Sequence, residues 1–121
     1  MIVRKWLENQ LNGKYWKNYL GTYGYRKIAI YGAGELGRYL AMELRSSEVE
    51  VLNYIDRNAH ELNEVMHIPV VTLDEFINTF GKESDAIIVT AISADHDVLH
   101  EIVCRLPELP VMSLRDMIFE I

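Results

Sequence analysis

Apolar residues recur along the chain with two different periods, which predict alternating helices and strands. Helical spacing, three to four residues apart, covers residues 2–11, 14–20, 35–44, 73–80, 95–106 and 113–120. Short apolar runs rich in β-branched residues fall between these segments, at 27–31, 49–55, 68–71, 85–91 and 111–112. From residue 27 onward strands and helices alternate, which is the pattern of an α/β domain with a parallel sheet.

The alternation predicts a Rossmann-like three-layer α/β fold over residues 27–121, with residues 1–26 as a preceding helical arm. We expect a five-stranded parallel sheet in the order 3-2-1-4-5. The nearly continuous apolar run at 85–91 is typical of a central parallel strand covered on both faces. Residues 57–67 are mostly polar without a sustained period, so we expect a loop or a broken helical turn there.

The first strand of this domain ends in a glycine-rich turn, Gly32-Ala33-Gly34-Glu35-Leu36-Gly37. In such a turn the first glycine allows a sharp bend, and the second leaves room for a phosphate beside the main chain. The third glycine lets the following helix pack closely on the strand. Free amides and the helix dipole at the start of that helix attract an anion, typically a diphosphate. The turn therefore predicts a nucleotide or dinucleotide site.

Residues at the ends of two other strands complete the predicted site. Asp56 ends the second strand about 20 residues after the turn, where an acid accepts hydrogen bonds from ribose hydroxyls. Arg57 either meets a ribose phosphate or a base, or is a solvated loop cation. Thr90 and Ala91 end the fourth strand beside the turn, with Ser93 as a further contact candidate. Thr90 could equally do no more than end a strand.

A degenerate turn that keeps its shape without a ligand is the alternative interpretation. Glu35 supports it, because a carboxylate just inside the helix suits the dipole but repels a diphosphate if it points inward. The chain would then be a protein interaction or oligomerisation domain with an unoccupied nucleotide site.

Size and composition favour a cytoplasmic binding module over an enzyme. A chain of 121 residues forms one domain. A full dinucleotide fold joins two mononucleotide halves, and only about one half fits this length. The content of 50% hydrophobic and 25% charged residues is that of a soluble globular protein. No apolar run approaches the roughly 18 residues of a transmembrane segment, and we find no secretory leader. No residue resembles the acid or base of a hydride transfer.

Cysteine and histidine positions predict no metal centre. Cys104 is the only cysteine, which excludes an internal disulfide and a thiolate cluster. His96 and His100 lie four residues apart on one predicted helix, a spacing similar to that of the H-E-x-x-H zinc motif. Asp97 replaces its glutamate base, and no third ligand is well placed.

Charge and aromatic residues single out the arm. Residues 1–27 carry six cations against one acid, a net charge of +5. The rest of the chain must therefore carry −11 to give the total charge of −6. An acidic body repels polyanions and no recognition motif accompanies the basic arm, so we do not predict nucleic-acid binding. Trp6 and Trp16 either pack on the sheet of their own chain or anchor an oligomer or a partner enzyme.

Taken together, these motifs resemble the small Rossmann-like nucleotide-binding domains of bacterial surface-polysaccharide biosynthesis. The resemblance covers residues 27–119 and is carried by segments 28–37, 54–56, 68–70, 73–75 and 85–90. The chain looks like the N-terminal domain that precedes nucleotide-sugar dehydratases, and like modules attached to sugar acyl- or glycosyltransferases.

The resemblance implies a role in polysaccharide or sugar-nucleotide metabolism and a bound cofactor, NAD(P) foremost, with coenzyme A (CoA) or a nucleotide-sugar as the other choices. By position, Gly32, Gly34 and Gly37 would hold phosphate and Asp56 a ribose. If the chain were part of an enzyme, the resemblance implies an NAD(P)-dependent sugar-nucleotide oxidoreductase or dehydratase.

Overall fold

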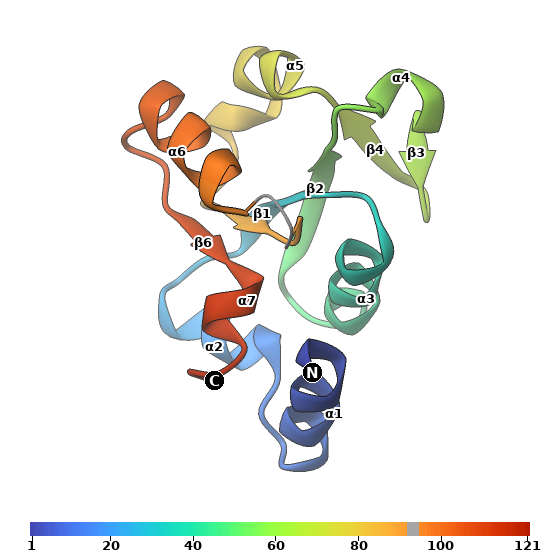
Figure 1. The fold of residues 1–121 in the computed structure, drawn as a ribbon, viewed down its shortest axis with the longest axis vertical. Helices are drawn as coiled ribbons and strands as arrows, with labels where there is room; N and C mark the ends of the chain where they lie inside the picture. Colours follow the sequence, from blue (N-terminus) through green and yellow to red (C-terminus); the bar gives the residue numbers. More distant parts are fainter. Residues whose placement is uncertain (92–94) are drawn as a thin grey trace.

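A six-stranded sheet runs through the middle of the molecule, with helices on both faces (Figure 1). The structure is a computed structural model that describes residues 1–91 and 95–121. The strands are β1 (Lys27–Tyr31), β2 (Glu50–Ile55), β3 (Glu64–Val65), β4 (Ile68–Val71), β5 (Ala86–Val89) and β6 (Val111–Ser113). Their order is β3-β4-β2-β1-β5-β6, and every neighbouring pair is parallel except β3 and β4.

The predicted α/β class is confirmed, but the prediction of five parallel strands is wrong at one edge. The parallel strands β4-β2-β1-β5-β6 follow one another in the expected order, and β3 adds a sixth, antiparallel strand. It lies within residues 57–67, which also contain helix α4 (Ala59–Leu62). A two-residue turn, Met66-His67, joins β3 to β4, with φ values of 56° and 65°. Such turns usually contain Asn-Gly, so the sequence carries no signal for this one.

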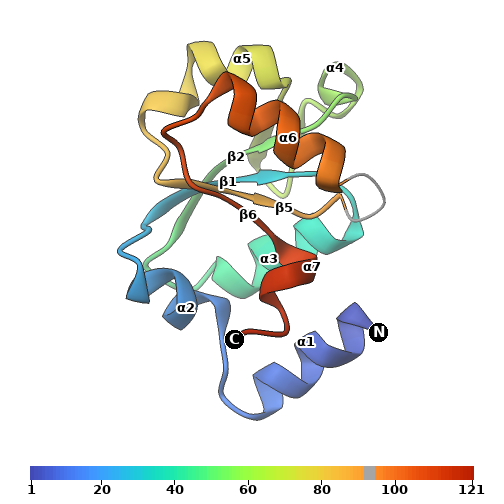
Figure 2. The ribbon, with the colours of Figure 1, turned by 60° about the vertical axis from the view of Figure 1, so that its left-hand side comes forward.

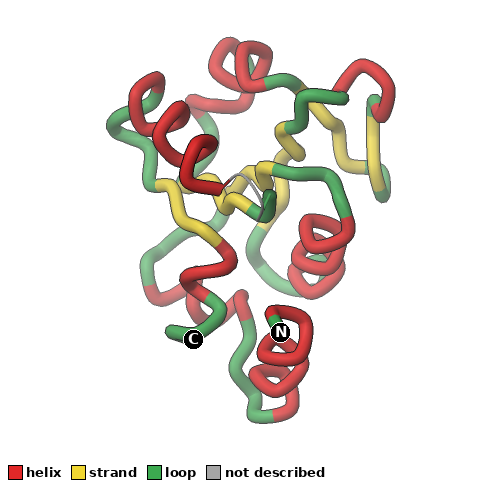
Figure 3. The backbone as a smooth tube through the Cα atoms, in the orientation of Figure 1, coloured by secondary structure: helices red, strands yellow, loops and turns green. Residues whose placement is uncertain are grey.

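The helices divide between the two faces of the sheet, as the turned view and the backbone tube show (Figures 2 and 3). One face is covered by α2 (Trp16–Thr22), α3 (Glu35–Leu44) and α7 (Leu114–Met117), and α1 (Ile2–Leu11) lies beyond α3 on the same side. The other is covered by α5 (Leu73–Asn78), the 3-10 turn η1 (Phe80–Lys82) and α6 (Asp95–Arg105). Alternate residues of β1 point into the two hydrophobic cores on either side of the sheet. Ile28 and Ile30 belong to the core under α3, and Ala29 and Tyr31 belong to the core under α5 and α6. None of the described helices is long and apolar enough to span a bilayer.

The arm packs into the core of its own chain. Trp6 and Trp16 retain only 5% and 1% of their exposed surface and join the same cluster as Leu40, Leu44 and Ile118. Their rings meet edge to face, with centroids 6.3 Å apart. Of the two predicted roles for these tryptophans, the structure shows packing within their own chain.

A single carboxylate on α3 fastens the arm. Glu43 Oε1 accepts hydrogen bonds from Trp6 Nε1 and Gln10 Nε2, both 2.8 Å long, and Oε2 accepts from the Trp16 backbone N–H at 2.7 Å. Buried Asn9 adds a second tie, donating from Nδ2 to the Ile118 carbonyl at 2.9 Å. Both arm helices are therefore hydrogen-bonded to the domain that follows them.

We expect Glu43→Ala to lower the free energy of unfolding by about 3 kcal/mol, because three donors lose a charged acceptor. Glu43→Gln keeps one carbonyl acceptor, so the expected loss is smaller. Urea denaturation followed by tryptophan fluorescence measures both. Glu101→Ala, at an exposed position of α6, is the matched control. Equal stability of the Glu43→Ala and Glu101→Ala variants would contradict a fastening role for Glu43.

Candidate functional site

An open cleft of about 510 Å³ lies at the carboxyl edge of the parallel strands. It is formed by the glycine turn, the first turn of α3 and the ends of β2 and β5. Its lining contains eight of the eleven residues that the sequence predicts for the site: Gly32, Gly34, Glu35, Leu36, Gly37, Asp56, Thr90 and Ala91. Ala33 and Arg57 do not line the cleft, and Ser93 falls outside the described residues.

Two of the three glycines are required by a close approach of α3 to the turn after β1. A Cβ added at Gly37 would stand 2.0 Å from the Gly32 carbonyl oxygen, a backbone atom. Gly32 has φ 109°, and a Cβ there would stand 2.7 Å from Thr90 Oγ1. The Thr90 hydroxyl, itself buried, donates toward the Tyr31 and Gly32 carbonyls at 2.9 and 3.2 Å. Thr90 therefore holds the turn in place, a role beyond ending a strand.

Gly34 differs from the other two glycines, because no atom of the described residues outside its own local backbone lies within 4 Å of the position of its missing Cβ. The residue is the N-cap of α3 and supplies no side-chain cap. Within residues 1–91 and 95–121, no group accepts a hydrogen bond from the amides of Gly34, Glu35 or Leu36. A turn of N–H groups thus faces open space at the positive end of a helix dipole, which is an arrangement suited to an anion.

Asp56 contacts the glycine turn directly. Its Oδ2 accepts from the Ala33 amide and its Oδ1 from the Asn58 amide, both at 2.9 Å. Ala33 is buried, so its contribution to the site is a backbone amide already paired with Asp56. A carboxylate has four lone-pair positions, so each Asp56 oxygen can still accept one more donor. The acid at the end of β2 thus both shapes the turn and retains capacity for a ribose hydroxyl.

Glu35 lines the cleft with its carboxylate held by the next helical turn. Tyr39 donates its hydroxyl proton to Glu35 Oε1 at 2.6 Å, and this hydrogen bond raises the pKa of Tyr39. Both side chains are exposed, so water also screens the Glu35 charge. The contact with Tyr39 draws this carboxylate along the helix surface.

The structure adds one cation that the sequence analysis did not single out and leaves another without an ion pair. Arg38, exposed in the first turn of α3, donates from Nε to the Ala33 carbonyl at 3.2 Å. Its place directly after the last glycine of the motif was the available signal. Arg57 is exposed beside Asp56 and forms no ion pair with any residue that the structure describes.

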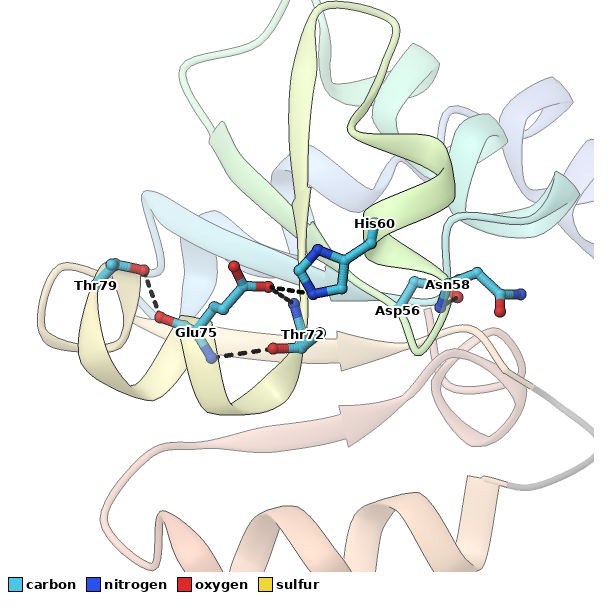
Figure 4. A network of polar contacts seen from close by, with 6 residues as sticks. All are labelled: Asp56, Asn58, His60, Thr72, Glu75 and Thr79. Carbon is cyan, nitrogen blue, oxygen red and sulfur yellow. Dashed lines mark hydrogen bonds and ion pairs between the residues drawn. The ribbon is translucent and has the colours of Figure 1, made fainter.

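A separate group of polar contacts lies at the start of α5, next to the end of β2 (Figure 4). Thr72 and Glu75 form the capping box at the start of α5: Thr72 Oγ1 accepts from the Glu75 amide at 3.2 Å, and Glu75 Oε1 accepts from the Thr72 amide at 2.9 Å. His60 Nε2 lies 3.9 Å from the same Glu75 oxygen (Figure 4). The hydrogen bonds from Thr72 lower the pKa of Glu75 from its ordinary 4.5.

The histidines of α6 contact different neighbours. His96 Nε2 lies 3.3 Å from an Arg115 nitrogen, and His100 Nε2 lies 3.7 Å from Cys104 Sγ. In the part of the chain described, no group of three His, Cys, Asp or Glu residues is placed to hold a metal ion.

Comparisons with known proteins do not assign the chain to a family. No protein-family model matches the chain, and no curated protein or solved structure matches it either.

We expect Gly37→Ala to destabilise the protein by about 3 kcal/mol, because the new methyl group must displace backbone at Gly32. Gly34→Ala fills open space, so its effect on the free energy of unfolding should stay within about 0.5 kcal/mol. Urea denaturation of both variants tests the difference. Similar losses at the two positions would contradict the close approach described above.

We expect part of the stability to depend on pH through Glu75. Because its folded pKa is lowered, its contribution is present above the ordinary value of 4.5 and is lost as the pH falls through the folded value. The stability difference between wild type and Glu75→Gln should therefore shrink between about pH 6 and about pH 3. Urea denaturation across this range measures it, with Glu83→Gln, an exposed acid outside the box, as the control. A difference that is constant with pH would contradict the prediction.

Proposed function

We propose that this chain is a binding module for a nucleotide that carries a diphosphate. The observation that carries the proposal is the set of amides at Gly34, Glu35 and Leu36, which pair with no residue that the structure describes and face a cleft left open by the absent Cβ of Gly34. Gly32 and Gly37 are explained by packing within the chain, whereas the open space at Gly34 is not required by any internal contact. A diphosphate supplies acceptors for those amides and negative charge for the helix dipole.

Asp56 would bind the sugar next to the phosphates. Its two oxygens each hold one backbone amide and can each take a hydroxyl donor in addition. The carboxylate is fixed by these contacts, so a ribose would meet an acceptor already in position. The ligand's ribose would then lie near the end of β2, and its phosphates over the turn.

The titratable side chains of the cleft support a binding role over turnover. Among the described residues of its lining, the titratable side chains are Glu35, held by Tyr39, and Asp56, held by two amides. Both carboxylates are therefore engaged in hydrogen bonds within the chain. We therefore propose a carrier or sensor of NAD(P), a nucleotide-sugar or coenzyme A, which all contain a diphosphate. The resemblance noted in the sequence suggests such a module in sugar-nucleotide or polysaccharide metabolism.

A second candidate function is protein interaction through the Rossmann-like scaffold without a ligand. The observation that favours it is an exposed apolar face on the arm, where Val3, Leu7 and Leu11 are 51%, 55% and 78% exposed. This function and nucleotide binding use different surfaces.

Thermal denaturation with NAD, NADP, coenzyme A and UDP-sugars tests the proposal. A true ligand at about 100 times its Kd should raise Tm by roughly 10 °C through mass action. Gly34→Arg should remove this shift because the long side chain fills the space over the amides, while the unliganded Tm changes little.

Gly21→Arg is the matched control, because Gly21 also has nothing within 4 Å and lies on α2 away from the cleft. It should keep the full ligand shift. Flat melting curves with all four ligand classes, or an equal shift in the Gly34→Arg variant, would overturn the proposed site.

A further inference from the structure

Helix α1 presents an apolar stripe to solvent although its opposite side is buried. Val3, Leu7 and Leu11 follow one another at intervals of four residues and are all more than half exposed. Trp6 and Asn9, which are buried, point to the domain. The stripe lies beside α3, and a groove of about 370 Å³ between the two helices includes Tyr39 and Met42. Exposed apolar surface that is continuous over two helices is typical of an interaction site.

A pair of opposite charges borders this stripe on the side away from α3. Arg4 Nε lies 3.4 Å from Glu8 Oε1, one helical turn apart, and the Arg4 side chain is 85% exposed and the Glu8 side chain 50%. Along this side of α1, the N-terminal half therefore carries a positive charge at Arg4 and the C-terminal half a negative charge at Glu8. A partner with the reverse order of charges would be a second α1 helix running antiparallel.

We propose that the stripe on α1, with Tyr39 and Met42 of α3, is the contact face of a homodimer. Two α1 helices would cross antiparallel about a two-fold axis level with Trp6. At that register, Leu7 of the second copy lies level with residue 5, between Val3 and Leu7 of the first. Val3 of the second copy lies level with residue 9, between Leu7 and Leu11. The apolar side chains therefore interdigitate, as knobs do in helix pairs.

The same register brings Arg4 level with Glu8 of the second copy, and the two-fold axis repeats the pair in reverse. One helix thus carries both halves of a self-complementary charge pattern, which is what an isologous interface requires. Views of the fold support access to this face: α1 lies at the outer end of the molecule, beyond α3 and away from the sheet (Figures 1 and 2). The proposal does not depend on nucleotide binding.

Sedimentation equilibrium over a range reaching on the order of 100 µM tests the dimer, because a contact made mainly by one helix pair is at the small end of interfaces. We expect a monomer–dimer equilibrium in the wild type. Leu7→Asp should raise the dimer dissociation constant roughly 100-fold, since both copies lose a central apolar residue. Val103→Asp is the matched control, because Val103 is 52% exposed on α6. Circular dichroism checks that both variants fold.

Charge exchange tests the register. Arg4→Glu and Glu8→Arg should each weaken self-association, because like charges then meet across the axis. An equimolar mixture of these two variants should form a heterodimer, and the double variant R4E/E8R should recover the homodimer. A wild type that stays monomeric, a dimer unaffected by Leu7→Asp, or single charge variants that associate as strongly as wild type would overturn the proposal.

Discussion

The position of helix α3 depends on a contact between backbones that only glycine permits. Gly37 brings the first turn of the helix so close to the Gly32 carbonyl that any side chain would collide with it. Thr90 closes the contact from the end of β5 by donating to the same turn. Because the helix is fixed at this end, its first amides, which pair with no described residue, face the cleft, and its other end carries Glu43 to the arm. One packing constraint thus sets both the candidate site and the docking of the N-terminal helices.

Local sequence rules predicted the parts of the fold that have local causes. The glycine turn and the apolar run of β5 each carry their signal within a few residues. Strand β3 was missed because its turn uses Met66 and His67 in the left-handed conformation. Neither residue type indicates that geometry, so the hairpin that pairs β3 with β4 has no recognisable turn signal.

Roles that join distant segments could not be assigned from sequence. Glu43 is one acid among many on the chain, and only the fold brings both tryptophans of the arm to it. Asp56 was predicted for a ribose, and its place at the end of β2 was recognisable, yet its bond to the Ala33 amide depends on the exact path of the turn. The case for a diphosphate ligand rests on one feature seen twice: the glycine spacing in the sequence and the accessible amides at the start of α3 in the structure.

The location of the two tryptophans gives the molecule a built-in optical reporter. Both of the chain's indole rings lie where the arm meets α3, and neither lines the cleft at the glycine turn. Intrinsic emission therefore follows release of the arm, whereas far-ultraviolet circular dichroism follows the whole α/β body. If the arm detaches as a separate cooperative unit, the two signals will change at different denaturant concentrations, and the spacing between them measures how tightly the arm is coupled to the rest.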